Sequence, residues 1–334
     1  MTAIWAKTDP IPEGRELAIS IGKFDGVHKG HRRLLGVLRD RARENRLESM
    51  AIALDPHPLA VLDPDSAPPG INSVDDRGEL LARLGLDHVK LQEFNRDLAG
   101  LSADEFLGQL AAAGMRMLVA GANTRIGRRR AAGIPEIKDI CARLDVAVRT
   151  VPIASDGQAF STANLRARIG SGDLAGAGAI SGRRHSLAAR VESGAGRGAE
   201  LGFPTANLTP DRKLQLPPDG VYAVSALLAD ENALRAGVAN IGVRPTFGGD
   251  RRLLEVHLFD FDGRLEGRRM RVYLERFLRP EIKFAGPREL VDQIRIDCRE
   301  ARAVDPGPAC RYGPWLRPRS PRRRKSADDP VSAD

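Results

Sequence analysis

The sequence from Gly194 to Asn207 reads G-A-G-R-G-A-E-L-G-F-P-T-A-N. Its four glycines can adopt positive φ angles and bring bare backbone N–H groups close to an anion. Pro204 then removes one donor and fixes its own φ. This composition favours a loop that approaches a ligand, with phosphate as the natural anion, but a glycine-rich β-turn with a Thr–Asn cap would have the same composition. The glycines are Gly194, Gly196, Gly198 and Gly202.

Two oxygen-bearing side chains follow this proline. Thr205 and Asn207 are alternate residues, so they lie on one face if the chain is extended there. Hydroxyl and amide oxygens suit a hard cation such as Mg²⁺. The two residues are therefore candidate metal ligands beside a phosphate loop.

The whole stretch resembles the signature of riboflavin kinases, in which a glycine-rich loop is followed by G-F-P-T-A-N. The resemblance extends over about residues 180 to 303. It implies phosphorylation of riboflavin to FMN by ATP and Mg²⁺. The further segments that carry it are G-V-Y-A-V from Gly220, N-I-G-V-R-P-T-F-G-G from Asn240, L-E-V-H-L-F-D-F from Leu254 and F-L-R-P-E-I-K-F from Phe277.

The second half of the chain has the rhythm of short antiparallel strands. Apolar and polar residues alternate in segments that end at Gly, Pro and Asp turns, which predicts a small antiparallel β-barrel. A helix at about 287–303 should close it, with Leu290, Ile294 and Cys298 on the buried side. The predicted strands are 185–192, 222–228, 236–243, 252–261 and 268–277.

Glu255 is the candidate catalytic carboxylate of this half. Strict alternation buries Leu254 and Val256 and places Glu255 on the opposite face, which is either a site or simply solvent. The resemblance implies that Glu255 is the general base for the ribityl 5′-hydroxyl. It also implies that the loop containing Arg244 and Thr246 lies near the flavin or the nucleotide.

The first half alternates strands and helices, which predicts a parallel sheet wound on both faces with ligands at the carboxyl ends of its strands. The first predicted helix places Leu34, Leu38 and Ala42 on one face. The predicted strands are 17–21, 49–54, 89–91, 115–120 and 146–151, and the further helices are 77–84, 103–113 and 135–144.

His28 and His31 lie where the first strand passes into the first helix, so two imidazoles and the free N–H groups of the helix converge on one point. Two exposed histidines on a first helical turn would have the same spacing. The segment G-K-F-D-G-V-H-K-G-H, however, resembles the H-x-G-H signature of bacterial FMN adenylyltransferase domains. This resemblance implies that both histidines contact the ATP phosphates and stabilise charge as pyrophosphate leaves. The phosphate contacts that it implies in this segment are Gly22, Phe24, Asp25, Gly26 and Gly30.

The resemblance to the adenylyltransferase domain continues, with two departures. D-P-H-P makes His57 a candidate pocket residue, although a turn residue between prolines is the alternative. The segment G-A-N-T-R-I-G keeps Arg125, and a flavin contact is expected at Asn123 and Arg125.

The segment S-T-A-N-L-R keeps Ser161 and Arg166 as ATP contacts but has Ala163 and Asn164 where the family usually has Thr and Arg. Because a neutral amide cannot replace the bidentate, charged contact of a guanidinium, binding of the ATP triphosphate should be weaker. Arg128, Arg129 and Arg130 either compensate or form a solvated charge run.

The domain limits follow from these segments and from composition. Five glycines in residues 170–182 mark the boundary region, so we expect an adenylyltransferase-like domain at 1–178 and a kinase domain at 179–304. Residues 305–334 are rich in Pro and Arg and are expected to form a disordered basic tail. They carry seven Lys and Arg against four Asp, so part of the net charge of +8 is local.

Composition also limits the function classes. No long apolar run or signal segment occurs, which predicts a cytoplasmic protein without a membrane span. Three widely spaced cysteines predict neither a disulfide framework nor a metal motif. Aromatic residues make up only 4%, so nucleic acid is an unlikely partner despite the basic charge. The predicted enzyme makes FMN and FAD from riboflavin and ATP. The alternatives are a kinase with a degenerate N-terminal domain and a basic interaction protein on an enzyme-derived scaffold.

Overall fold

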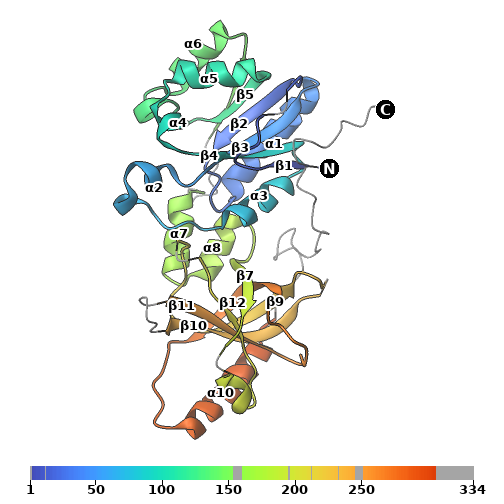
Figure 1. Cartoon of the computed structure of the whole chain (residues 1–334), viewed down its shortest axis with the longest axis vertical. Coiled ribbons are helices and arrows are strands. Elements are labelled where there is room, and N and C mark those ends of the chain that lie inside the picture. The colour runs from blue at the N-terminus through green and yellow to red at the C-terminus, as the bar shows by residue number, and fades with distance from the viewer. Residues whose placement is uncertain are drawn as a thin grey trace. The chain divides into compact units, whose positions relative to one another are not determined.

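The chain forms two compact units, which divide between Thr162 and Ala163 (Figure 1). The computed structural model describes residues 2–11, 13–152, 160–194, 196–211, 213–231, 233–244 and 251–305. The predicted tail therefore lies outside the described residues from residue 306 onwards.

The first unit is built on a six-stranded sheet in which all neighbouring strands are parallel. The strand order is β1-β4-β3-β2-β5-β6, which confirms the predicted parallel architecture. β1 was not predicted, because three residues are too few to show a period. The strands are β1 (Ala3–Trp5), β2 (Leu17–Gly22), β3 (Glu48–Asp55), β4 (His88–Glu93), β5 (Met115–Gly121) and β6 (Ala147–Val151).

Helices cover this sheet through apolar faces. Leu17 and Ile19 of β2 belong to one core cluster with Leu107 of α5 and Ile137 of α6. The first helix buries Leu35 rather than the predicted Leu34, together with Leu38 and Ala42. The helices of this unit are α1 (Lys29–Glu44), α2 (Pro58–Leu62), α3 (Val74–Ala82), α4 (Arg96–Gly100), α5 (Ala103–Ala112) and α6 (Ile134–Arg143), with short 3₁₀ turns η1 (Pro64–Ser66) and η2 (Arg128–Arg130).

β2 lies between β3 and β5, so the chain leaves β2 toward one side of the sheet and later returns to its other side. Ligands of such sheets bind outside the carboxyl ends of the strands at this switch point. The segments that follow β2, β3 and β5 are therefore neighbours at one edge, and they carry the residues that the sequence nominated.

The second unit is a closed antiparallel barrel with the order β10-β11-β8-β7-β12-β9, as predicted. Alternate residues such as Leu254 and Val256 fill its interior. A helix packs on the barrel as expected; Leu290, Ile294 and Cys298 are half-buried, while Asp297 and Ala301 are its fully buried residues. The elements are β7 (Ser186–Glu192), α9 (Arg197–Glu200), β8 (Ala206–Leu208), β9 (Gly220–Leu228), β10 (Arg235–Arg244), β11 (Arg251–Leu258), β12 (Arg269–Arg279) and α10 (Pro287–Arg302).

The glycine-rich residues 170–182 are largely helical. They follow α7 (Thr162–Gly170) and contain α8 (Leu174–Ser181). Asp173 caps the start of α8 through the N–H of Gly176, and Gly182 ends it in the left-handed conformation. None of the helices in the described part of the chain is long and apolar enough to cross a membrane.

Candidate functional sites

The first candidate site begins with the tight loop between β2 and α1. Phe24, Gly26 and Val27 all have positive φ, and the Phe24 ring is buried against Gly22. A Cβ at residue 22 would lie 3.0 Å from that ring, so glycine allows the turn. The carboxylate of Asp25 is buried and accepts the N–H groups of residues 71 and 72 at 2.9 and 3.3 Å. Asp25 therefore holds the loop in place within the unit.

His28 and His31 come together at the start of α1. His28 is the N-cap, and its Nδ1 accepts the N–H of His31 at 3.4 Å. The neutral His28 ring then carries its proton on Nε2. The two rings stack with centroids 3.7 Å apart, and Phe24 packs edge-on against His31. No acidic residue occupies the first turn of α1, so the positive end of the helix dipole is not neutralised there. This arrangement favours an anion.

The segment after β3 is held firmly next to this loop. Asp55 forms ion pairs with Lys7 and with the buried Arg77, each at 2.5 Å, and Arg77 also donates to the carbonyl of Lys23 at 3.1 Å. His57 caps α2 through Nδ1, and its Nε2 lies 3.1 Å from Lys23 Nζ. Sequence reasoning nominated His57 but missed Lys23, which brings a cation to the same edge of the sheet.

The segment after β5 contains the first departure from the family pattern. Asn123 and Arg125 are exposed, and Arg125 Nε donates to the carbonyl of Arg130 at 3.0 Å. Gly127 has a positive φ, and a Cβ there would lie 2.5 Å from the backbone nitrogen of Ala103. The geometry of this loop therefore depends on glycine at residue 127. Arg128, Arg129 and Arg130 are all exposed, as expected for a solvated charge run.

The second departure lies around the start of α7. Ser161 directly precedes the helix, and the hydroxyl of Thr162 donates to the carbonyl of Asp25 at 3.3 Å. Ala163 and Asn164 are exposed in its first turn. Arg166 belongs to the second compact unit, so its contact with ATP stays a prediction.

The second candidate site contains the glycine-rich loop before β8. A Cβ at Gly194 would overlap the amide nitrogen of Asn207, and one at Gly198 would lie 2.5 Å from the carbonyl oxygen of Phe203. Gly196 and Gly202 have positive φ. The loop thus folds tightly over the start of β8: close approach requires glycine at residues 194 and 198, and positive φ favours it at residues 196 and 202.

A row of polar residues crosses four strands of the barrel beside this loop. Glu255 on β11 lies opposite Asn207 on β8 and Asn240 on β10, and Asn207 lies opposite Glu192 on β7. Directly opposite residues share a face. Because Leu254 and Val256 point into the core, this row occupies the outer face, where Glu255 is half-buried. Register therefore brings together a carboxylate and Asn207, one of the two nominated metal ligands.

Thr205 and Asn207 suit Mg²⁺ in their chemistry. Asn207 is buried, and its amide nitrogen faces Gly194. The amide oxygen is therefore the atom of this side chain that would bind a metal ion. Within the described residues no group of three His, Cys, Asp or Glu side chains forms a metal site. Mg²⁺ commonly takes one or two protein oxygens together with substrate phosphates, so a hydroxyl and an amide fit that role.

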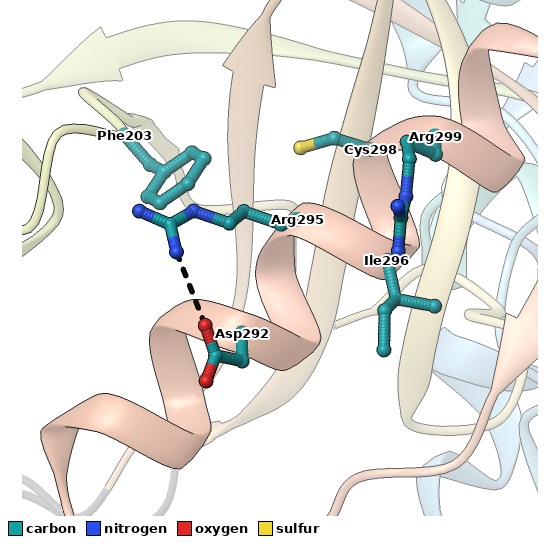
Figure 2. A pocket seen from close by; sticks show the side chains of 6 residues that line it. All are labelled: Phe203, Asp292, Arg295, Ile296, Cys298 and Arg299. Atoms are coloured by element: carbon teal, nitrogen blue, oxygen red, sulfur yellow. Dashed lines mark hydrogen bonds and ion pairs between the residues drawn. The ribbon is translucent and has the colours of Figure 1, made fainter.

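A hollow of about 550 Å³ lies between α10 and the glycine-rich loop. In Figure 2 the side chain of Arg295 extends from α10 toward the Phe203 ring, and Cys298 lies further along the helix. Arg295 pairs with Asp292 at 3.1 Å. The ring of Phe203 also packs edge-on against His257, which is two residues after Glu255 on β11. The hollow and the polar row are thus connected through Phe203 and His257.

Sequence reasoning missed this hollow. Apart from Cys298, which was predicted on the buried side, its lining residues on α10 have the pattern of helix-surface residues, and only the packing of the helix on the barrel makes them neighbours of Phe203. Thr246 lies outside the described residues, and the structure describes the backbone of Arg244 alone, at the end of β10. Their roles near the flavin stay predictions.

The comparisons with known proteins agree with the two units. A family model described as FAD synthetase matches residues 11–163, and one described as riboflavin kinase matches residues 181–304. The bifunctional riboflavin kinase/FMN adenylyltransferase of Escherichia coli K12 is 36% identical over 294 residues, which cover 85% of this chain and 91% of that protein. The protein of the same name from Bacillus subtilis 168 is 30% identical, covering 86% of this chain and 92% of its own length.

A solved structure has a similar fold. A crystal structure described as a macrolide-efflux protein from Streptococcus pneumoniae has a TM-score of 0.80 and 28% sequence identity. The similarity covers 91% of this chain and 99% of that one. The description of that protein differs from those of the family models and curated relatives, which all concern flavin nucleotides.

Proposed function

The chain belongs to the family of bifunctional riboflavin kinase/FMN adenylyltransferases, and we propose that its barrel makes FMN while its parallel-sheet unit makes FAD. It is a kinase and a nucleotidyltransferase that uses ATP. We place the adenylyltransferase domain at 1–178 and the kinase domain at 179–304. The observation that carries the proposal is the row Asn207, Glu255, Asn240 beside the glycine-rich loop.

In the barrel, Glu255 acts as the general base. Its carboxylate accepts the proton of the ribityl 5′-hydroxyl while the hydroxyl oxygen attacks the γ-phosphorus of ATP and the bond to the ADP oxygen breaks. The backbone N–H groups of the glycine-rich loop hold the phosphates. Thr205 and Asn207 would hold Mg²⁺, which neutralises phosphate charge when bound.

The flavin ring is proposed to occupy the hollow at α10. The cavity is large enough for a small heterocycle, since ligand pockets span about 300 to 1,000 Å³. The Phe203 ring offers a stacking surface, and the connection through His257 directs the ribityl chain toward Glu255. Arg295 and Arg299 supply polar groups at the rim.

In the parallel-sheet unit, a phosphate oxygen of FMN attacks the α-phosphorus of ATP, and the bond to pyrophosphate breaks. The Nε2–H of His28, the His31 ring and the N–H groups at the start of α1 stabilise the developing negative charge. Lys23, which lies beside His57, adds a cation at the same edge. The two histidines thus act by electrostatic stabilisation and take no proton from FMN.

A kinase with a degenerate N-terminal domain is less well supported, because the FAD synthetase model matches residues 11–163 and the histidine pair is intact. Nothing in the described residues favours a separate interaction function. The cytoplasmic location and the absence of a nucleic-acid partner stay predictions from composition.

The decisive experiment supplies riboflavin, ATP and Mg²⁺ and separates FMN from FAD by chromatography. Both products should appear. FMN without FAD would remove the adenylyltransferase proposal, and the absence of both would remove the whole proposal.

The flavin pocket has its own test in Cys298, which lines the hollow. In a Cys310→Ser background, riboflavin should protect Cys298 from slow alkylation at alkaline pH, since burial raises the pKa of its thiol. The buried Cys141 is the control, because burial raises the pKa of that thiol to about 11. Equal alkylation of Cys298 with and without riboflavin would place the flavin elsewhere.

A further inference from the structure

The end of β12 makes two contacts that the reaction described above does not use. Arg279 is the last residue of β12, Pro280 and Glu281 follow it, and all three belong to the segment F-L-R-P-E-I-K-F. Glu281 accepts a hydrogen bond from the amide nitrogen of Asn240 at 3.0 Å. Asn240 is the residue directly opposite Glu255 in the β10–β11 pair. One contact of this segment therefore reaches the neighbour of the proposed general base.

Two glycines allow the segment to lie close to the barrel. A Cβ at Gly242 would overlap the carboxylate oxygen of Glu281, and it would lie 3.2 Å from the amide nitrogen of Asn240. A Cβ at Gly220 would lie 2.5 Å from the carbonyl oxygen of Arg279. The pair Asn240–Glu281 thus occupies a space that exists only because residue 242 has no side chain.

The other contact reaches α10. Arg279 forms a two-pronged ion pair with Asp297 at 2.8 and 2.7 Å, and Asp297 also accepts from Gln293 at 2.9 Å. The side chains of Arg279 and Asp297 are 16% and 5% exposed, so water screens the pair little. β12 has a register irregularity between Phe277 and Arg279, and such bulges re-aim the side chains that follow.

Asp297 lies between two residues that line the hollow. Ile296 and Cys298 flank it in sequence, and Arg295 and Arg299 complete that side of the hollow (Figure 2). Fixing Asp297 to Arg279 therefore fixes the rotation of α10 about its own axis. Arg279 thus fixes α10, which lines the hollow, through Asp297. Glu281, two residues later, binds Asn240, the residue opposite Glu255.

We propose that Arg279 and Glu281 are positioning residues for phosphoryl transfer to riboflavin, which together set the flavin pocket relative to Glu255. This inference rests on the proposed kinase function of the barrel. Glu281 orients the Asn240 amide beside Glu255, and Arg279 orients the wall of α10. A geometric error of 1 Å at a reacting centre can cost about 10²-fold in rate, so loss of the contacts made by Arg279 and Glu281 should have a strong effect.

Glu281 is tested by a set of four variants. Glu281→Ala and Gly242→Ala should each lower kcat for FMN formation by about 10- to 100-fold, with the KM for riboflavin changed by less than about threefold. Glu281→Gln keeps an acceptor oxygen and should retain most activity. The added Cβ at residue 242 would displace Glu281 and press on the Asn240 amide, so both substitutions disturb the same Asn240–Glu281 pair and the double variant should be little worse than either single variant.

The controls are built into the same chain. Glu266→Ala removes another half-exposed carboxylate of the barrel unit and should leave FMN formation unchanged. FAD formation from supplied FMN should be unaffected in every variant. Equal loss of both activities, or additive effects of Glu281→Ala and Gly242→Ala, would overturn the role of Glu281.

Arg279 is tested with Arg279→Lys, which keeps the charge beside the buried Asp297 but loses the two-pronged geometry. The dissociation constant for riboflavin, measured by flavin fluorescence without ATP, should rise by about 10-fold, a larger change than in kcat. Unchanged binding would overturn the role of Arg279. If the unmodified chain bound riboflavin but made no FMN, the kinase proposal would fail while this binding result would still decide the role of Arg279.

Discussion

The two units of the chain build their sites in different ways. In the parallel-sheet unit, the residues come from the segments that follow β2, β3 and β5, so the strand order assembles the site. In the barrel, Glu192, Asn207, Glu255 and Asn240 meet on the outer face through the register of four strands. The first kind of site depends on loops and a helix start, whereas the second depends on pairing that a slip of one residue would destroy.

The charges of the two sites differ as well. The first gathers two histidines, Lys23 and a helix whose first turn has no acidic residue, and its carboxylates Asp25 and Asp55 are held by backbone N–H groups and by cationic side chains. The second has Glu255 beside neutral amides. FMN already carries an anionic nucleophile, while riboflavin offers a neutral hydroxyl that must lose a proton. The difference in charge thus corresponds to the difference in nucleophile.

The largest effect that separates the units is expected from Glu255→Gln. General-base catalysis contributes about 10² to 10⁴ in rate, so kcat for FMN formation should fall by at least about 10²-fold while riboflavin still binds. FAD formation from supplied FMN should be unchanged. Near-normal FMN formation in this variant would show that Glu255 is only a surface residue of β11.

The reverse result is expected from His28→Ala. Removing one donor that stabilises transition-state charge costs about 10² to 10³ in rate, so FAD formation should fall by that factor. Riboflavin phosphorylation in the same preparation should be unaffected. The measurement is the initial rate of each product with FMN or riboflavin supplied separately, and a parallel loss of both activities would mean that the substitution disturbs more than the first unit.

The sequence predicted both architectures because each has a strong period: buried runs between helices in one half, alternating residues in the other. The alternation around Glu255 also placed that residue outside the core, as observed. Short elements such as β1 and β8 have too few residues for any period. The hollow at α10 could not be predicted, because Phe203 and Arg295 become neighbours only through tertiary packing. The close approach of Glu281 to Gly242 could not be predicted either, since a glycine within a strand can mark a bulge, a bend or a close contact.

The departures from the family pattern at Ala163 and Asn164 predict that a substitution can increase the rate of FAD formation. A hydrogen bond to a charged group contributes about 1.5 to 3 kcal/mol, so a restored guanidinium that grips the triphosphate should matter. We expect FMN to accumulate in the unmodified enzyme because FAD formation is the slower step. The double change Ala163→Thr with Asn164→Arg should raise FAD formation about tenfold without altering FMN formation. No gain would mean that the exposed arginines after β5 already supply the contact or that these positions never contact ATP.

The metal requirement should also separate the units. Asn207→Ala removes one oxygen ligand and should raise the Mg²⁺ concentration needed for half-maximal FMN formation by several-fold, with a smaller change in the KM for riboflavin. Thr205→Ala should act in the same direction. The Mg²⁺ dependence of FAD formation is the internal control. An effect confined to riboflavin would assign both residues to the flavin pocket.

The smallest difference concerns acid stability. His185, which precedes β7, is buried, and its Nε2 has no hydrogen-bond partner within the described residues. Burial, with a smaller contribution from Arg183, lowers the pKa of His185 to about 4. The unfolded chain binds this proton near pH 6.5 and the folded barrel does not, so stability is fully present above pH 6.5 and is lost as the pH falls toward 4. The buried His28, by contrast, has the N–H of His31 as a partner.

Between pH 7.5 and 5.5 this single group should therefore lower the stability of the barrel by about 1 kcal/mol, which corresponds to a shift of about 3 °C in its melting temperature. His185→Gln, which cannot titrate, should reduce the pH dependence by that amount. The measurement is the temperature at which riboflavin phosphorylation is irreversibly lost after brief heating at each pH, with FAD formation followed in parallel. A variant whose barrel loses as much heat resistance at pH 5.5 as the unmodified chain would show that other groups control the acid sensitivity of this unit.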